Sequence, residues 1–145
     1  MSVEQLSYAC WLLGQGLGNA GVYWIPTVSL VALCLYFGLR LVQERGVRII
    51  KLGASLTLMS PSVFSVALVL WGTLLVWPHS EDTTAPAWRV WGVLCLLVFH
   101  GAACVVVLSR SIGYRAFSLS VLSIQFWIAL CVASVVAMSV TANWV

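Results

Sequence analysis

His100, in the segment VFHGAAC, is the one ionisable side chain near the middle of a long apolar stretch of this sequence. Cys104 follows one helical turn later, and an imidazole and a thiol on one helix face are donors for a metal or for haem. A haem between helices usually has two protein ligands, and the only other histidine, His79, lies in a polar loop. The alternative is a neutral histidine that hydrogen-bonds a serine on a neighbouring helix. Both interpretations of His100 stay open, and we assign no cofactor.

A second candidate is the segment GQGLGNAG, in which Gly16, Gly18 and Gly21 have the G-x-G-x-x-G spacing of a dinucleotide-binding turn. That turn needs a preceding strand and a following helix that receives a pyrophosphate. Here an apolar segment follows, and the next acidic residue, Glu44, lies beyond it. The sequence therefore predicts a mechanical role, either as a flexible hinge or, through Gly14 and Gly18, as a close helix contact.

The remaining reactive side chains do not form a catalytic set. The five cysteines contain no C-x-x-C pair, so we interpret them as packing residues. The loop segment His79–Asp82 has weak metal donors and is interpreted as a solvated turn. No Asp or Glu falls inside a long apolar segment, which disfavours proton-coupled carriers and enzymes that use paired carboxylates. We therefore predict a protein that is not an enzyme.

The elements that would position these residues are membrane helices. Of the 145 residues, 62% are hydrophobic and 8% are charged, whereas a typical soluble domain has about 25% charged residues. A helix needs about 20 apolar residues to cross a bilayer, and four segments qualify, at about residues 22–41, 52–77, 87–109 and 116–141. The sequence predicts an all-α integral membrane protein, residues 1–145, with four transmembrane helices in a single bundle of two hairpins.

The basic residues predict the orientation of these spans. Six of the seven Lys and Arg residues flank the two turns on one side, and this side is expected to be cytoplasmic. They are Arg40, Arg45, Arg48, Lys51, Arg110 and Arg115. Both termini would then lie outside, and we expect a bacterial inner membrane. The basic turns suit anionic lipid headgroups or an acidic partner, and no nucleic acid is expected.

Aromatic and N-terminal residues extend this prediction. Tryptophans gather where an indole ring can lie among the headgroups, near the predicted outer ends. These are Trp24, Trp77, Trp88, Trp91 and Trp144. Residues 1–20 contain no Lys or Arg, so they lack the positive start of a secretory signal. We interpret Gln5–Leu13 as a short helix on the outer interface or as an extension of the first span.

Two patterns inside the spans concern packing. The last span carries small or polar residues at every fourth position, which is typical of helices that associate in lipid. This small-residue stripe consists of Gln125, Ala129, Ala133, Ala137 and Thr141, and its partner is either this chain or another subunit. In the second span, Pro61 removes a backbone donor and predicts a bend. Ser60, Ser62 and Ser65 are placed to satisfy the freed carbonyls, and a broken helix can also mark a transporter site.

Three functions follow from these features. The leading hypothesis is a non-enzymatic membrane subunit that assembles or stabilises a larger complex or an oligomer of itself. The second is a small oligomeric channel or transporter whose path is lined by Pro61, Gln125 or His100. The third is a haem- or quinone-associated anchor centred on His100. A weak likeness between residues 55–68 and 118–130 also suggests that the two hairpins are repeats.

Overall fold

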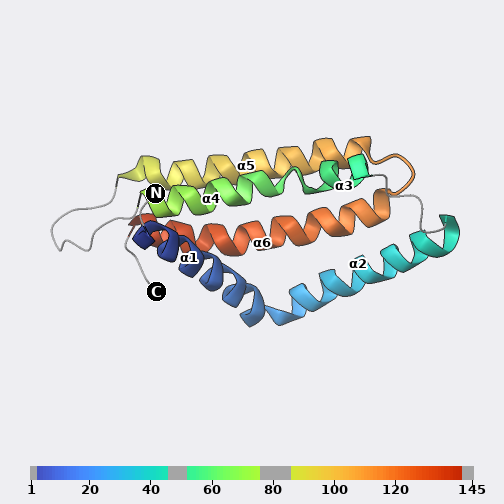
Figure 1. The fold of residues 1–145 in the computed structure, drawn as a ribbon, viewed down its shortest axis with the longest axis horizontal. Helices are drawn as coiled ribbons and strands as arrows, with labels where there is room; N and C mark the ends of the chain where they lie inside the picture. The colour runs from blue at the N-terminus through green and yellow to red at the C-terminus, as the bar shows by residue number, and fades with distance from the viewer. Residues whose placement is uncertain (1–2, 46–51, 76–85, 142–145) are drawn as a thin grey trace.

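The computed structural model describes residues 3–45, 52–75 and 86–141, and these residues form helices without any strand (Figure 1). The helices are α1 (Val3–Val22), α2 (Trp24–Arg45), α3 (Leu52–Met59), α4 (Ser62–Leu74), α5 (Ala87–Arg110) and α6 (Arg115–Thr141). Four stretches are long and apolar enough to span a membrane, namely Trp24–Gln43, Leu56–Leu74, Ala87–Arg110 and Arg115–Thr141. The all-helical prediction is confirmed, while membrane insertion and orientation stay predictions.

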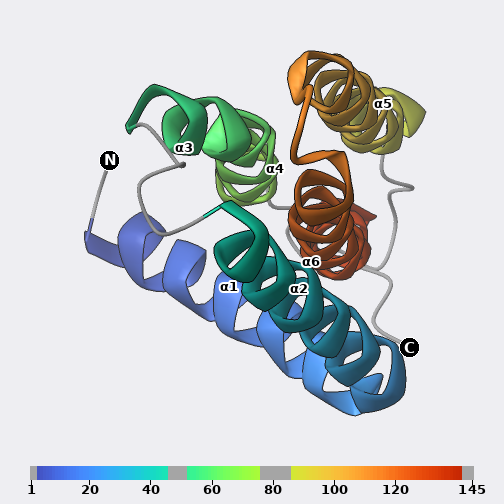
Figure 2. The ribbon, with the colours of Figure 1, turned by 90° about the vertical axis from the view of Figure 1, so that its right-hand side faces the viewer.

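Helix α6 is the axis of the molecule. It packs against α1, α2, α4 and α5, and Figures 1 and 2 show these helices on different sides of it. The chain passes along the bundle four times, first as α1 with α2, then as α3 with α4, and then as α5 and α6. The beginning of α1 and the end of α6 lie at the same end of the bundle, where the Tyr8 hydroxyl hydrogen-bonds Ser139 Oγ at 2.8 Å.

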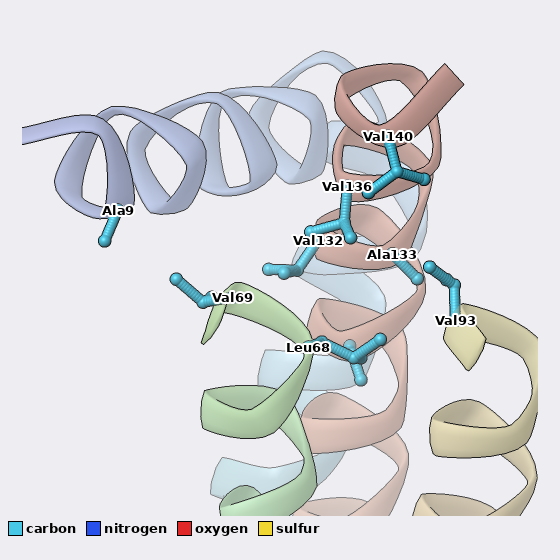
Figure 3. Close-up of a cluster of buried hydrophobic side chains, with 9 residues drawn as sticks. Ala9, Leu68, Val69, Val93, Val132, Ala133, Val136 and Val140 are labelled. Carbon is cyan, nitrogen blue, oxygen red and sulfur yellow. The ribbon is translucent and has the colours of Figure 1, made fainter. Parts of the chain in front are cut away.

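The main hydrophobic core fills the space between α6, α4, α5 and the first half of α1. Figure 3 shows Leu68, Val93 and Val132 pointing into it from three different helices. The small-residue stripe of α6 belongs to this core, because Ala129 is 0% and Ala133 is 4% exposed. Small side chains let helices approach closely where lipid offers little hydrophobic gain. The structure therefore uses the middle of the stripe for packing within this chain.

The glycine-rich segment is part of a continuous helix and does not form the expected hinge. Helix α1 runs from Val3 to Val22 without interruption. The close contact is made by Gly16, where an added Cβ would lie 2.8 Å from Val132 Cγ2 and 3.0 Å from Val132 Cα. Around Gly14 and Gly18 there is nothing within 4 Å of such a Cβ. The prediction of close packing holds for a different glycine, because the helix turns Gly16 toward α6.

The first pass along the bundle breaks at Tyr23, between α1 and α2. The Tyr23 ring lies edge-on to Trp127, with centroids 6.2 Å apart, and Trp127 is near the middle of α6. Trp127 Nε1 also donates a hydrogen bond to Thr27 Oγ1 at 3.0 Å. The start of α2, including Trp24, therefore lies halfway along α6. The tryptophan pattern had predicted Trp24 at the outer end, and this prediction is wrong. Helix α1 covers the other half of α6, so it is a structural part of the bundle.

The described arginines divide between the two ends of the bundle. Arg40, Arg110 and Arg115, and the last residue of α2, Arg45, lie at one end, which we call the basic end (Figure 1). Arg48 and Lys51 lie outside the described residues. Arg89 is at the opposite end, where its Nη1 donates to the Leu75 carbonyl at 2.7 Å and caps α4. A cation suits the negative end of a helix dipole, so Arg89 joins α4 to α5.

Candidate functional site

The site begins with the interruption of the second pass at Pro61. Helix α3 ends at Met59 and α4 begins at Ser62, and a tighter turn joins them, so the α-helical hydrogen bonding is interrupted at the predicted bend. Pro61 has no N–H for the Thr57 carbonyl, and Ser60 Oγ donates to that carbonyl instead, at 2.8 Å. Of the three serines expected to satisfy freed carbonyls, Ser60 is the one that the structure shows doing so.

A second carbonyl exposed by the break is satisfied from another helix. Gln125 Nε2 donates to the Leu58 carbonyl at 3.1 Å and lies 3.6 Å from Met59 Sδ. The sequence groups Gln125 with the small-residue stripe, but its side chain has a separate role, since it caps the broken helix. The signal was present in the sequence, because a glutamine in an apolar span needs a polar partner, and a helix interrupted at Pro61 exposes carbonyls next to the proline.

The other end of the Gln125 amide is the unusual feature. Its Oε1 is buried and has no hydrogen-bond partner among the described residues. A buried acceptor left without a partner costs about 1–3 kcal/mol. The amide is held by its nitrogen, so Oε1 has a fixed position, and because the atom is fully covered, an added group reaches it only when a neighbouring side chain moves.

A cavity of about 400 Å³ adjoins this amide, between α1, α4 and α6. Its polar lining is Gln125, Ser62 and Ser65, and its other walls are apolar. We call it the mid-depth cavity, and its lining residues are Ala9, Leu13, Ser62, Ser65, Val66, Val69, Leu70, Gln125 and Ile128. Val66 is 60% exposed and Leu13 is 42% exposed, so the cavity opens sideways between α4 and α1. The contribution of α1 to the cavity was not predicted, because Gln5–Leu13 was expected either on the outer interface or as an extension of the first span.

His100 lies behind Ser65, on α5. Its side chain is completely buried, and its ring lies between Phe64 and Phe126, with centroids 6.4 and 5.8 Å away. Its Nδ1 is 3.5 Å from Ser65 Oγ, the long limit of a hydrogen bond. This arrangement matches the neutral histidine next to a serine on a neighbouring helix. Because no part of the side chain reaches open space, this conformation gives a haem iron no access to the ring.

The Ser65–His100 pair also bears on enzyme chemistry. A hydroxyl next to an imidazole is the core of nucleophilic catalysis, and the base is normally oriented by a third group on its other nitrogen. His100 Nε2 is buried without a hydrogen-bond partner in the described part of the chain. The described part of the chain also contains no cluster of three His, Cys, Asp or Glu residues that could hold a metal. Among the described residues, therefore, no third group orients the imidazole of His100 toward Ser65.

The polar groups of the site lie at similar positions along the length of their helices. His100, Gln125 and the Pro61 break each lie within about one helical turn of the middle of their own pass along the bundle. If the apolar helices span a membrane, the polar groups lie near its midplane, where a polar side chain is costly and marks a candidate functional site.

Comparisons with known proteins do not assign this site. No protein-family model, curated protein or solved structure matches the chain. A functional argument therefore has to come from the residues of the site and their geometry.

Proposed function

We propose that the protein takes up a small uncharged molecule from the surrounding lipid into the mid-depth cavity. The observation that carries this proposal is the cavity next to the Pro61 break, with the Gln125 Oε1 acceptor buried and unsatisfied. Of the three functions that the sequence leaves open, this one is closest to the small transporter, because transporter sites are typically built at broken helices near the midplane.

The lining of the cavity defines the class of ligand. Its polar groups are two hydroxyls and one amide, and its lining includes no charged side chain. A charged ligand buried there would have no counter-charge. An apolar body with one hydrogen-bond donor fits, because a small side-chain movement would let the donor bind Gln125 Oε1 while the body lies against Val66, Val69 and Ile128. The volume is also in the range of small-molecule sites, about 300–1,000 Å³.

The lateral opening determines the route. None of the residues of the basic end lines the mid-depth cavity, so the described cavity is not a channel from end to end. Exposed Val66 and Leu13 mark the opening on the lipid-facing side. Entry from the bilayer between α1 and α4 therefore suits a ligand that is already dissolved in lipid.

The proposal is tested with a photoreactive probe, octanol that carries a diazirine, added to the protein in lipid nanodiscs. We expect cross-links on α1 and α4 around Leu13 and Val66, and fewer with the matching diazirine alkane that has no hydroxyl. Gln125→Leu should abolish this difference between the two probes. The control is Ser134→Ala, on the exposed face of α6, which should preserve it. Cross-links spread evenly over the apolar surface, with or without the hydroxyl, would contradict the proposal.

A second candidate is the membrane subunit that assembles a larger complex. Helix α2 favours this role, because its most apolar stretch has no residue buried within the molecule. In the corresponding stretch of α6, 39% of the residues are buried. The contact would have to use α2, since the middle of the small-residue stripe is already covered. Native mass spectrometry of the protein extracted gently from its own membrane distinguishes the two proposals. A stable additional subunit would favour the assembly role.

A further inference from the structure

A separate feature at the basic end points to a lipid. A groove of about 370 Å³ runs along α6 between α2 and α5. Its walls include Leu30 of α2, Leu108 of α5, and Leu119, Leu122 and Leu130 of α6, and it is almost entirely apolar. We call it the acyl groove. It lies on the other side of α6 from the α1 and α4 walls of the mid-depth cavity, and the two share no lining residue.

The acyl groove leads toward a smaller pocket that carries positive charge. This pocket has a volume of about 160 Å³ and lies between the end of α2 and the start of α6. Arg40 and Arg115 line it together with the aromatic rings of Phe37, Tyr114 and Phe117, and none of its lining residues is acidic. We call it the arginine pocket. A guanidinium presents five N–H donors in a planar fork that matches a phosphate.

The groove and the pocket follow one face of α6. Ala116 lines the arginine pocket, and Leu119, Ser123 and Leu130 continue from it along the groove at helical spacing. From Ala116 to Leu130 a helix rises about 21 Å at about 1.5 Å per residue. One leaflet of a bilayer is about 15 Å of hydrocarbon, so the groove is long enough for one acyl chain below its headgroup.

We infer that this surface holds one anionic phospholipid, with its phosphate in the arginine pocket and an acyl chain in the acyl groove. Charge and length select this occupant. Two arginines at the mouth match an anionic headgroup, and an apolar groove of one leaflet's depth matches the chain. Leu119 is 53% and Val105 is 67% exposed, so the chain can enter sideways from the leaflet. The inference is independent of the proposed function, because it uses a different surface.

The test is lipid retention measured by native mass spectrometry of the delipidated full-length protein. It is titrated with phosphatidylglycerol, with phosphatidylcholine of the same chains, and with glycerol phosphate. We expect one phosphatidylglycerol to be retained in preference to phosphatidylcholine, and no retention of glycerol phosphate, which has no chain for the groove. Retention of glycerol phosphate alone would identify a phosphate site and overturn the lipid inference.

Matched arginine variants separate a site from general attraction. Arg115→Gln should weaken phosphatidylglycerol binding about fivefold, the effect expected for one basic residue near an anionic headgroup. Arg110→Gln removes the same charge at the same end of the bundle but outside the arginine pocket, and it should change binding less than twofold. Equal effects of the two variants would overturn the inference. Ser123→Phe, which fills the groove, should lower the binding of both phospholipids, and unchanged binding would also overturn it.

Discussion

The first two passes of the chain along the bundle are interrupted near their middle, whereas the last two, α5 and α6, are continuous. The first pass breaks at Tyr23 and the second at Pro61. Both interruptions face α6, which supplies Trp127 to the first and Gln125 to the second. These two residues are two positions apart and therefore lie on different faces of the helix.

Together the two interruptions show how a small helical bundle can hold broken helices. Where no water reaches a break, its polar groups need partners within the protein. Some are local, since Ser60 donates to the Thr57 carbonyl and Thr27 to the Tyr23 carbonyl, and α6 supplies the others. The continuous hairpin of α5 and α6 provides partners from α6. The interrupted hairpin, from α1 to α4, provides most of the walls of the mid-depth cavity. The mid-depth cavity occurs where α1 and the start of α4 diverge from α6, next to the break that Gln125 supports.

The largest effect is expected where the first pass touches α6 most closely. Gly16→Leu places a side chain against the backbone of Val132 and should lower the free energy of unfolding by about 3 kcal/mol, the upper part of the range for overpacking. Equilibrium unfolding in mixed micelles measures this loss. Gly14→Leu is the control, because it points into open space and should be neutral or stabilising. Equal losses would show that α1 does not pack on α6 through Gly16.

The next effect concerns the second break. Gln125→Leu leaves the Leu58 carbonyl without its partner and should lower the free energy of unfolding by about 1–3 kcal/mol. Ser134→Leu is the control on the exposed face of the same helix. The same unfolding assay should show a much smaller change for it. A loss at Ser134 as large as at Gln125 would mean that α6 is generally sensitive to substitution.

The smallest effect is expected at the first break. Trp127→Phe keeps a ring next to Tyr23 but removes the N–H that binds Thr27. The free energy of unfolding should fall by about 1 kcal/mol, the usual contribution of one hydrogen bond. Trp91→Phe, at a ring that is 64% exposed, should change it less. If Trp91→Phe lowers the free energy of unfolding more than Trp127→Phe does, the hydrogen bond to Thr27 does not stabilise the break.

The sequence predicted the parts of this fold that depend on composition and on single residues. Apolar length indicated the four spans, Pro61 indicated the interruption of the second, and the spacing around Ala129 and Ala133 indicated a packing face. The break at Tyr23 was not predicted, although Pro26 has no N–H for the Val22 carbonyl and its ring crowds that carbonyl, at the residue where α1 ends. The glycines before it suggested a hinge, yet the helix continues through them.

The candidate site was harder to predict because its residues come from three separate helices. Gln125, Ser65 and His100 were each identified as polar groups inside a span. Their pairing depends on how α4, α5 and α6 are rotated about their axes, and local sequence patterns do not fix this rotation. The side wall formed by Ala9 and Leu13 depends in addition on α1 lying against the bundle.

The most direct test of the account is a double-mutant cycle between Pro61 and Gln125, measured by equilibrium unfolding. Pro61→Ala restores the N–H that the Thr57 carbonyl lacks and removes the ring that interrupts the helix, so the Ser62 N–H can reach the Leu58 carbonyl and the amide of Gln125 is no longer needed. We expect Gln125→Leu to be at least about 1 kcal/mol less destabilising in the Pro61→Ala background than in the natural sequence. The same loss in both backgrounds would contradict the claim that α6 supports the break through Gln125.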